Sequence, residues 1–247
     1  MSSARILIVD DEADTCANLF DILTDFGYLV DTAQNGAEAL ALIESQPFYD
    51  VALLDLRMPG MDGLELYRRI KQKSAGTVAL VVTAYASSDT AKSAISAGAR
   101  KVLSKPVDIR ELLGLVQVSL LSPLVLIVDD EAELCDNLWE VLHERGYRVH
   151  LAHDVSEARQ SLASCKFQIV LLDMKLPDGD GGQVFQQVRA TNPQARTIVI
   201  TGHRNELESR VKQAISEGAA GVAYKPFDVP ALLEIVEGCA PSNREST

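Results

Sequence analysis

The sequence contains few of the features that mark secreted, membrane-spanning or disulfide-rich proteins. Only 4 of its 247 residues are cysteines, and none belongs to a C-x-x-C pair, so no disulfide framework or thiolate metal site is indicated. Apolar runs such as 6–9 and 51–54 end at an aspartate, far short of the roughly 20 residues that cross a bilayer. The first residues contain no signal-peptide hydrophobic segment. We therefore expect a cytoplasmic protein that does not associate with membranes.

Positive charge is also scarce. The chain has 23 lysines and arginines against 35 aspartates and glutamates, which gives a net charge of −12. Both halves are acidic, with 11 basic and 16 acidic residues up to residue 121 and 12 and 19 after it. Because binding to nucleic acid phosphates depends on lysine and arginine, we expect no nucleic acid partner. The hydrophobic content of 47% suffices for one large core or two ordinary domains.

An internal repeat organises the chain. The segment ILIVDDEADTCANL at 6–19 recurs as VLIVDDEAELCDNL at 125–138, and VALLDLRMPGMDG at 51–63 recurs as IVLLDMKLPDGDG at 169–181. A period of this length is typical of a whole domain and too long for a solenoid repeat. We therefore predict two tandem domains, 1–121 and 122–240, followed by a polar, disordered tail at 241–247.

Each copy alternates short apolar runs with longer amphipathic stretches, which is the pattern of an α/β fold. The runs are continuously hydrophobic, as burial on both faces of a parallel sheet requires. We predict two doubly wound, five-stranded parallel-sheet domains in tandem. The expected strands are 5–9, 28–32, 50–54, 77–82 and 100–104, then 124–128, 147–152, 168–172, 196–200 and 221–224; the expected helices of the first copy are 14–26, 36–46, 63–73, 88–97 and 107–120.

Polar residues recur at the carboxyl ends of the expected strands, where ligands bind in open parallel sheets. In the first copy these are Asp10 and Asp11, Asp55, Thr83 and Lys105. Three carboxylates in one cleft repel one another unless a cation neutralises them, and Mg²⁺ suits such oxygen ligands. Lysine and threonine beside them can stabilise a phosphoryl group during its transfer.

We take Asp55 as the phosphoryl acceptor. It ends the expected central strand and begins a loop containing Pro59, Gly60 and Gly63, which we expect to leave its oxygen accessible. Each residue alone has an ordinary explanation, since aspartate often caps helices, threonine forms turns and lysine is usually a solvated surface charge. The recurrence of all five positions in both copies makes that explanation insufficient.

These two sets resemble the phosphoacceptor site of receiver domains in two-component response regulators. The resemblance extends from about residue 6 to 239 and is carried by Asp10-Asp11, Asp55, Thr83 and Lys105-Pro106 and by Asp129-Asp130, Asp173, Thr201 and Lys225-Pro226. It implies a flavodoxin-like receiver fold that accepts phosphoryl groups from a sensor histidine kinase, or from a histidine phosphotransfer protein, with Mg²⁺ as cofactor.

The resemblance also implies a role for each matching residue. Asp55 and Asp173 are the implied phosphorylated residues. Asp11 and Asp130 would bind Mg²⁺ directly, and Asp10 and Asp129 largely through water. The backbone carbonyls of Arg57 and Lys175 would complete the metal shell. The phosphoryl group would receive hydrogen bonds from Thr83 and Thr201 and would pair with Lys105 and Lys225.

The sequence departs from the receiver pattern in one respect. Many receivers carry an aromatic residue three positions before the lysine, but Val102 and Val222 occupy that position here, and Tyr224 lies directly before Lys225. We therefore do not expect an aromatic rotamer switch.

The two copies also differ beside the acceptor. Arg57 and Tyr85 stand in the first copy where Lys175 and His203 stand in the second. These positions flank the path of an attacking water, so we expect the two aspartyl phosphates to hydrolyse at different rates.

Our preferred function is a signalling protein that acts through protein contacts, with no DNA-binding output domain and an unknown downstream partner. Its chemistry would be limited to self-catalysed phosphotransfer and autodephosphorylation, so we do not expect an enzyme. Alternatives are a phosphorelay shuttle, a phosphate sink, or the amino-terminal receiver part of a longer kinase or regulator. An aspartate-nucleophile phosphohydrolase is disfavoured by the short loops. The helix at 107–120 is a candidate homodimer surface, although core packing is the favoured explanation of its apolar residues.

Overall fold

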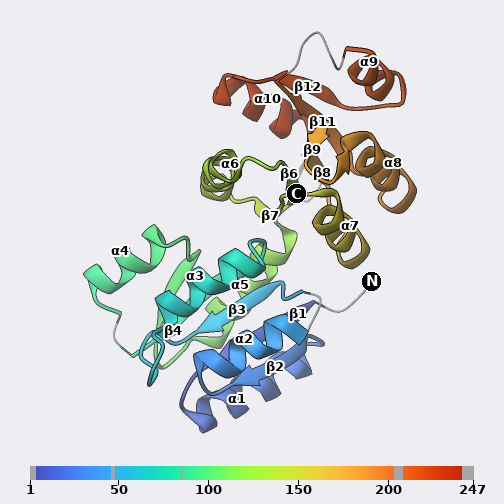
Figure 1. Ribbon diagram of the computed structural model, residues 1–247. Coiled ribbons are helices and arrows are strands. Elements are labelled where there is room, and N and C mark those ends of the chain that lie inside the picture. Colours follow the sequence, from blue (N-terminus) through green and yellow to red (C-terminus); the bar gives the residue numbers. More distant parts are fainter. Residues whose placement is uncertain (1–3, 46–47, 85, 203–207, 241–247) are drawn as a thin grey trace, which may run out of the picture. The chain divides into compact units, whose positions relative to one another are not determined.

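The computed structural model describes residues 4–45, 48–84, 86–202 and 208–240. The chain divides into two compact units, Met1–Ser122 and Pro123–Thr247, each with its own sheet and helices (Figure 1). The division falls one residue after the boundary expected from the repeat. The tail at 241–247, Tyr85 and His203 lie outside the described residues, so the predictions about them stay predictions.

Strands and helices alternate in both units, as the hydrophobic pattern predicts. Within the described ranges, no helix is long and apolar enough to cross a membrane. The elements of the first unit are β1 (Arg5–Val9), α1 (Ala13–Asp25), β2 (Leu29–Ala33), α2 (Gly36–Ser45), β3 (Val51–Leu54), α3 (Gly63–Lys73), β4 (Val78–Thr83), α4 (Ser88–Ser96), β5 (Lys101–Ser104) and α5 (Ile109–Leu121). Those of the second unit are β6 (Leu124–Val128), α6 (Ala132–Glu144), β7 (Arg148–Ala152), α7 (Val155–Ser164), β8 (Ile169–Asp173), β9 (Lys175–Leu176), β10 (Gly179–Asp180), α8 (Gly181–Thr191), β11 (Arg196–Thr201), α9 (Glu208–Ser216), β12 (Gly221–Tyr224) and α10 (Val229–Cys239).

The two five-stranded sheets have the same topology. Their strand orders are β2-β1-β3-β4-β5 and β7-β6-β8-β11-β12, and every neighbouring pair in them is parallel. Strand order reverses between β1 and β3, and between β6 and β8, so each sheet has a switch point at the carboxyl ends of those strands. The doubly wound α/β fold predicted from the sequence is therefore confirmed.

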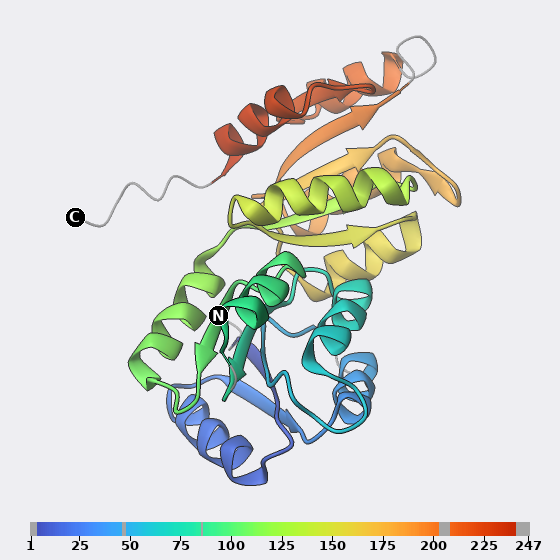
Figure 2. The same ribbon diagram turned by 90° about the vertical axis from the view of Figure 1, so that its left-hand side faces the viewer.

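Alternate residues of each central strand pack on opposite faces of the first sheet. Ile6 and Ile8 join a core with α1 and α5, whereas Leu7 and Val9 join a second core with α2, α3 and α4. Figure 2 shows this unit from a second direction, with helices on both sides of its sheet. Burial on both faces explains why the strands are continuously hydrophobic.

The sequence did not predict the two-stranded antiparallel hairpin of β9 and β10, in which Lys175 lies opposite Asp180 and Leu176 opposite Gly179. Strands of two residues are too short to produce a hydrophobic pattern. Element ends also shift slightly. Helix α5 begins at Ile109 because the Asp108 side chain caps it, accepting from the N–H groups of Arg110 and Glu111.

The cysteines behave as small core residues. Cys16, Cys135 and Cys165 are buried, and Cys239 is half-buried. Burial raises the pKa of the Cys135 thiol to about 12, and it also raises the pKa of Cys239. Because only a thiolate is a good nucleophile, both position and charge state make Cys135 unreactive.

Timed alkylation of the native protein with iodoacetamide at pH 8 should therefore label Cys239 well before Cys135. Peptide mass spectrometry gives the extent of labelling at each cysteine. A control in denaturant should label all four cysteines at similar rates, since the protecting core is lost. Equal native labelling of Cys135 and Cys239 would contradict this packing.

Candidate functional site

The register of the sheets brings the predicted acidic residues together. Val9 pairs with Leu54, so Asp10 and Asp55, which follow them, lie side by side. One carboxylate oxygen from each of Asp10, Asp11 and Asp55 lies within 4.8 Å of the others. The second unit repeats this group with Asp129, Asp130 and Asp173. In each group the exposed member is the second aspartate of the pair, and the other two are buried.

A lysine ammonium bridges the two buried carboxylates of each group. Lys105 Nζ lies 2.7 Å from Asp10 Oδ2 and 2.8 Å from Asp55 Oδ2, and these three side chains are only 17%, 3% and 8% exposed. In the second unit, Lys225 Nζ lies 2.7 Å from an oxygen of Asp129 and 2.9 Å from an oxygen of Asp173. The sequence predicted both lysines at the site, and the structure gives them an additional role, since each one forms ion pairs with two carboxylates of its own unit.

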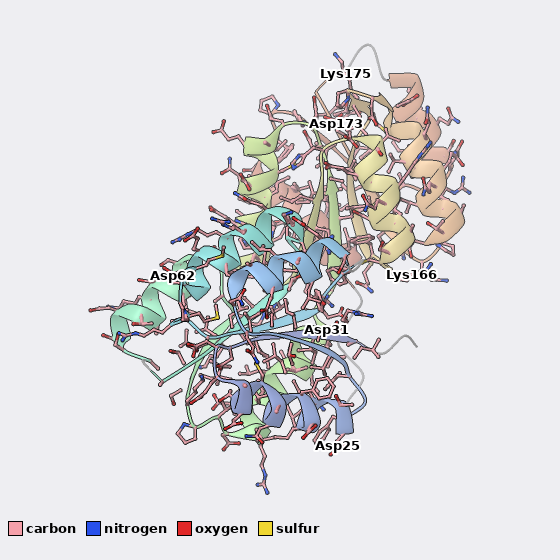
Figure 3. The ribbon with its side chains drawn as sticks, turned by 60° about the horizontal axis from the view of Figure 1, so that its bottom comes forward. Asp25, Asp31, Asp62, Lys166, Asp173 and Lys175 are labelled. Atoms are coloured by element: carbon pink, nitrogen blue, oxygen red, sulfur yellow. The ribbon has the colours of Figure 1, made fainter. Side chains whose placement is uncertain are left out.

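Backbone N–H groups hold the other oxygen of each buried aspartate. Asp10 Oδ1 accepts from the N–H of Glu12 at 3.0 Å, and Asp55 Oδ1 accepts from the N–H of Arg57 at 3.1 Å. The second unit has the same two bonds, to Asp129 from Glu131 and to Asp173 from Lys175, at 3.0 and 2.9 Å. In Figure 3 the labelled Asp173 and Lys175 lie at one end of the second unit and Lys166 lies at the other. Because Lys166 precedes β8, Asp173 and Lys175 mark the carboxyl end of this strand.

The electrostatics of the site reflect its burial. Burial raises the pKa of Asp10 and of Asp129, and the hydrogen bonds from the lysines offset this only in part. For Lys105, burial alone would lower the pKa, but the bonds to Asp10 and Asp55 outweigh it and hold the pKa above its ordinary value. The proton therefore stays on the lysine at neutral pH.

The predicted threonines lie at the same edge of each sheet. Thr83 ends β4 and Thr201 ends β11, and both are fully buried. The Lys105 N–H donates to the Thr83 carbonyl at 2.9 Å, and the Lys225 N–H donates to the Thr201 carbonyl at 2.8 Å. Each lysine is therefore fixed to its threonine through the backbone, and the following Lys-Pro peptide bond is cis in both units.

Two glycines allow a helix to begin directly against the acceptor. An added Cβ on Gly63 would lie 2.1 Å from the backbone oxygen of Asp55, and one on Gly181 would lie 2.3 Å from that of Asp173. Distances this short exclude any side chain. Because α3 and α8 begin at these glycines, the acceptor loop must fold back tightly onto the end of the central strand.

Sequence reasoning missed two residues that support the site. The thiols of Cys16 and Cys135 each donate to the backbone carbonyl of the first aspartate, Asp10 or Asp129, at 3.3 Å. They fix α1 and α6 beneath the acidic pair. The signal was present, because the two cysteines occupy the same position of the repeat, but cysteine spacing indicates only disulfides and metal sites.

The expectation of an open acceptor was wrong for this state. The Asp55 side chain is 8% exposed, its Oδ2 is paired with Lys105, and its Oδ1 accepts a backbone N–H. A loop rich in glycine and proline does not by itself expose a neighbouring side chain. Both carboxylate oxygens of Asp55 are therefore already paired in this structure.

The donor set fits a hard divalent cation. Opposite oxygens around an octahedral Mg²⁺ lie about 4.2 Å apart, which agrees with carboxylate oxygens gathered within 4.8 Å. All three donors are oxygens, and the exposed Asp11 and Asp130 carboxylates give the ion a route from solvent. The three carboxylates named for the metal shell therefore lie together in each unit.

The switch position of many receivers is filled by valine in both units. Val102 is partly buried and packs against the core formed with α2, α3 and α4. Val222 and Tyr224 are partly buried on β12. That no aromatic rotamer switch operates stays a prediction, and in the first unit Val102 contributes to packing.

The chain is similar to known proteins of one family. The model of the family described as response regulator receiver domain matches residues 6–117 and 125–237. A response regulator receiver protein of Anaeromyxobacter sp. (strain Fw109-5) is 36% identical over 233 residues, which is 94% of each chain. The response regulator protein PilR of Pseudomonas aeruginosa is 41% identical over 120 residues, 49% of this chain and 27% of PilR.

A solved structure matches about half of this chain. A CheY-like response regulator receiver domain from Methanospirillum hungatei is 37% identical, with a TM-score of 0.45, and covers 47% of this chain and 92% of its own. The family match covers both units, and the Anaeromyxobacter relative covers nearly the whole chain. The chain therefore belongs to the response regulator receiver family and carries two receiver domains in tandem.

Proposed function

We propose that each unit accepts a phosphoryl group on one aspartate, Asp55 in the first and Asp173 in the second, in a reaction that depends on Mg²⁺. The donor is a phosphohistidine on a sensor kinase or a histidine phosphotransfer protein. One observation carries this proposal: in both units a buried aspartate at the switch point shares a lysine with a second aspartate, beside a third that faces solvent.

The proposed transfer is a simple displacement. An oxygen of the Asp55 carboxylate attacks the phosphorus of the donor phosphohistidine. The new P–O bond forms as the P–N bond breaks, and the imidazole nitrogen leaves with the electron pair and takes up a proton. Mg²⁺, when bound, neutralises charge on the phosphoryl oxygens and on the attacking carboxylate. Transfer to Asp173 would form and break the same bonds.

The residues around the acceptor have separate tasks in this proposal. Lys105 leaves the Asp55 oxygen and pairs with an oxygen of the transferred group, which keeps one positive charge in the site throughout. The N–H of Arg57 keeps the carboxylate oriented, and the Thr83 hydroxyl donates to the phosphoryl group. Asp10 and Asp11, with the Arg57 carbonyl, hold the cation. The corresponding residues perform these tasks in the second unit.

We further propose that the protein signals through protein contacts and turns over no external substrate. The two receiver matches span residues 6–117 and 125–237, which is most of the chain, and both halves are acidic. An acidic surface favours protein partners over nucleic acid. In this proposal the chemistry is limited to self-catalysed phosphotransfer and dephosphorylation, and the protein acts in the cytoplasm.

Mass spectrometry after brief exposure to acetyl phosphate and Mg²⁺ tests this function. Wild type should gain two phosphoryl adducts, and Asp55→Asn and Asp173→Asn should gain one each, because an amide cannot form the acyl phosphate. The matched control Asp25→Asn changes an exposed acid on α1 and should retain both adducts. Chelation of Mg²⁺ should abolish every adduct. Wild type without any adduct would refute the proposal.

Removal of the bridging lysine should destabilise the first unit in a pH-dependent way. Lys105→Ala leaves two buried carboxylates unpaired, which should lower its free energy of unfolding by about 3 kcal/mol at pH 7. The deficit should shrink at pH 5, because Asp10, whose pKa burial already raises, then binds a proton in the folded state that the unfolded chain does not bind.

Urea unfolding at both pH values measures this effect. Circular dichroism reports both units, and the single tryptophan, Trp139 on α6, reports the second unit in the same samples. Lys101→Ala, which removes an exposed lysine on β5, is the control and should change little. A deficit of equal size at both pH values would show that unpaired carboxylates are not its cause.

A further inference from the structure

The two acceptor loops have equal length but different anchors. In the first unit the loop after Asp55 makes a tight turn, in which the Met61 N–H donates to the Pro59 carbonyl at 3.1 Å and Gly60 adopts a positive φ of 85°. In the second unit the same stretch forms the β9–β10 hairpin. The residue that replaces Gly60 in the repeat is Asp178, at the turn of that hairpin.

Asp178 connects the hairpin to the beginning of α7. Its Oδ1 accepts from the Val155 N–H at 2.8 Å, and its Oδ2 accepts from the Ser156 N–H at 3.2 Å. These are the first two residues of α7, where helical N–H groups lack intrahelical partners and favour a negative charge. In the described part of the first unit, no side chain accepts from the corresponding N–H groups of Gly36 and Ala37.

A second contact supports this connection. In the second unit the loop residue at this contact is a glycine, Gly179. A Cβ added to it would lie 3.2 Å from the Val155 side chain. In the first unit the small residue is on the helix, since a Cβ on Gly36 would lie 2.7 Å from the Met61 sulfur. In both units a small residue therefore faces a larger side chain, but the small residue is in the loop in one unit and on the helix in the other. Among the described residues, the second unit alone adds hydrogen bonds from this loop position to the first two N–H groups of the helix.

The anchored segment contains a proposed metal ligand. Lys175 is the first residue of β9, lies opposite Asp180, and donates its N–H to Asp173. The hairpin is held at its turn by Asp178 and at its end by Asp180, whose side chain accepts from the Gly182 N–H at 2.9 Å. The backbone around Lys175 is therefore fixed at both ends before any ligand binds.

We propose that Asp178 is a positioning residue that holds the acceptor loop of the second unit in the conformation that binds a divalent cation, a task for which the first unit has no equivalent. The inference rests on the proposed function, because it takes the Lys175 carbonyl as a cation ligand. A loop that is already ordered loses less conformational entropy on binding. Removal of its anchor should therefore lower the affinity of the second site for the cation.

Calorimetric titration of the full-length chain with Mg²⁺ tests this inference. Asp11→Ala removes a ligand from the first site and isolates the second, and Asp130→Ala isolates the first. In the Asp11→Ala background, Asp178→Gly should weaken binding at the second site about fivefold, which is the size of an ordinary capping interaction. In the Asp130→Ala background, the same substitution should leave the first site unchanged.

Asp178→Asn distinguishes the effect of the hydrogen bond to the Val155 N–H from the effect of the negative charge. Asparagine keeps the acceptor oxygen for the Val155 N–H but loses the negative charge, so it should retain most of the affinity. Equal weakening by Asp178→Asn and Asp178→Gly would assign the effect to charge and overturn the inference. Unchanged affinity in both variants, or weakening of both sites by Asp178→Gly, would also overturn it.

Amide hydrogen exchange gives a readout that does not depend on affinity. Because binding and anchoring are linked, Mg²⁺ should slow exchange at Val155 and Ser156 in wild type but not in Asp178→Gly. If Asp178→Gly leaves this response and the affinity intact while Asp173 still becomes phosphorylated, only the inference fails. If wild type binds no Mg²⁺ and gains no phosphoryl group, the proposed function itself fails.

Discussion

Each unit buries two carboxylates at the end of a parallel sheet, and one lysine forms ion pairs with both. Two buried negative charges without a partner would cost several kcal/mol, so Asp10 and Asp55 depend on Lys105 for their position. The strand register places the carboxylates side by side. The hydrogen bond from the Lys105 backbone N–H to the Thr83 carbonyl positions the lysine beside them. The same contacts bring together the groups that the proposed phosphoryl transfer would use.

The same pairing implies that the resting site is closed. The acceptor oxygens of both units are occupied by the lysine and a backbone N–H, and their side chains are less than one tenth exposed. A divalent cation and a phosphoryl group offer the lysine and the carboxylates new partners of opposite charge. In the proposed reaction the cation would compensate the carboxylates when the lysine turns to the phosphoryl group. The acceptor loop of the second unit is also hydrogen-bonded to α7 through Asp178.

The sequence predicted the parts that depend on local pattern and on the repeat. Continuous apolar strands followed by Asp10, Asp55 and Lys105 predicted the fold and which polar residues lie together, because parallel strands end at one edge. The connection from Asp178 to α7 was not predictable, since it joins segments that are distant in sequence. The burial of Asp55 was also missed. The sequence pattern predicts which residues lie together, but it does not predict which of them form ion pairs with one another.

Nuclear magnetic resonance of the lysine ammonium groups tests the central claim most directly. We predict that Lys105 and Lys225 give Nζ signals protected from solvent exchange, unlike the exposed Lys101, because each donates to two buried carboxylates. Addition of Mg²⁺ should shift both signals as the carboxylates acquire a new partner. Lys105 and Lys225 signals that resemble that of Lys101 and do not respond to Mg²⁺ would contradict the account.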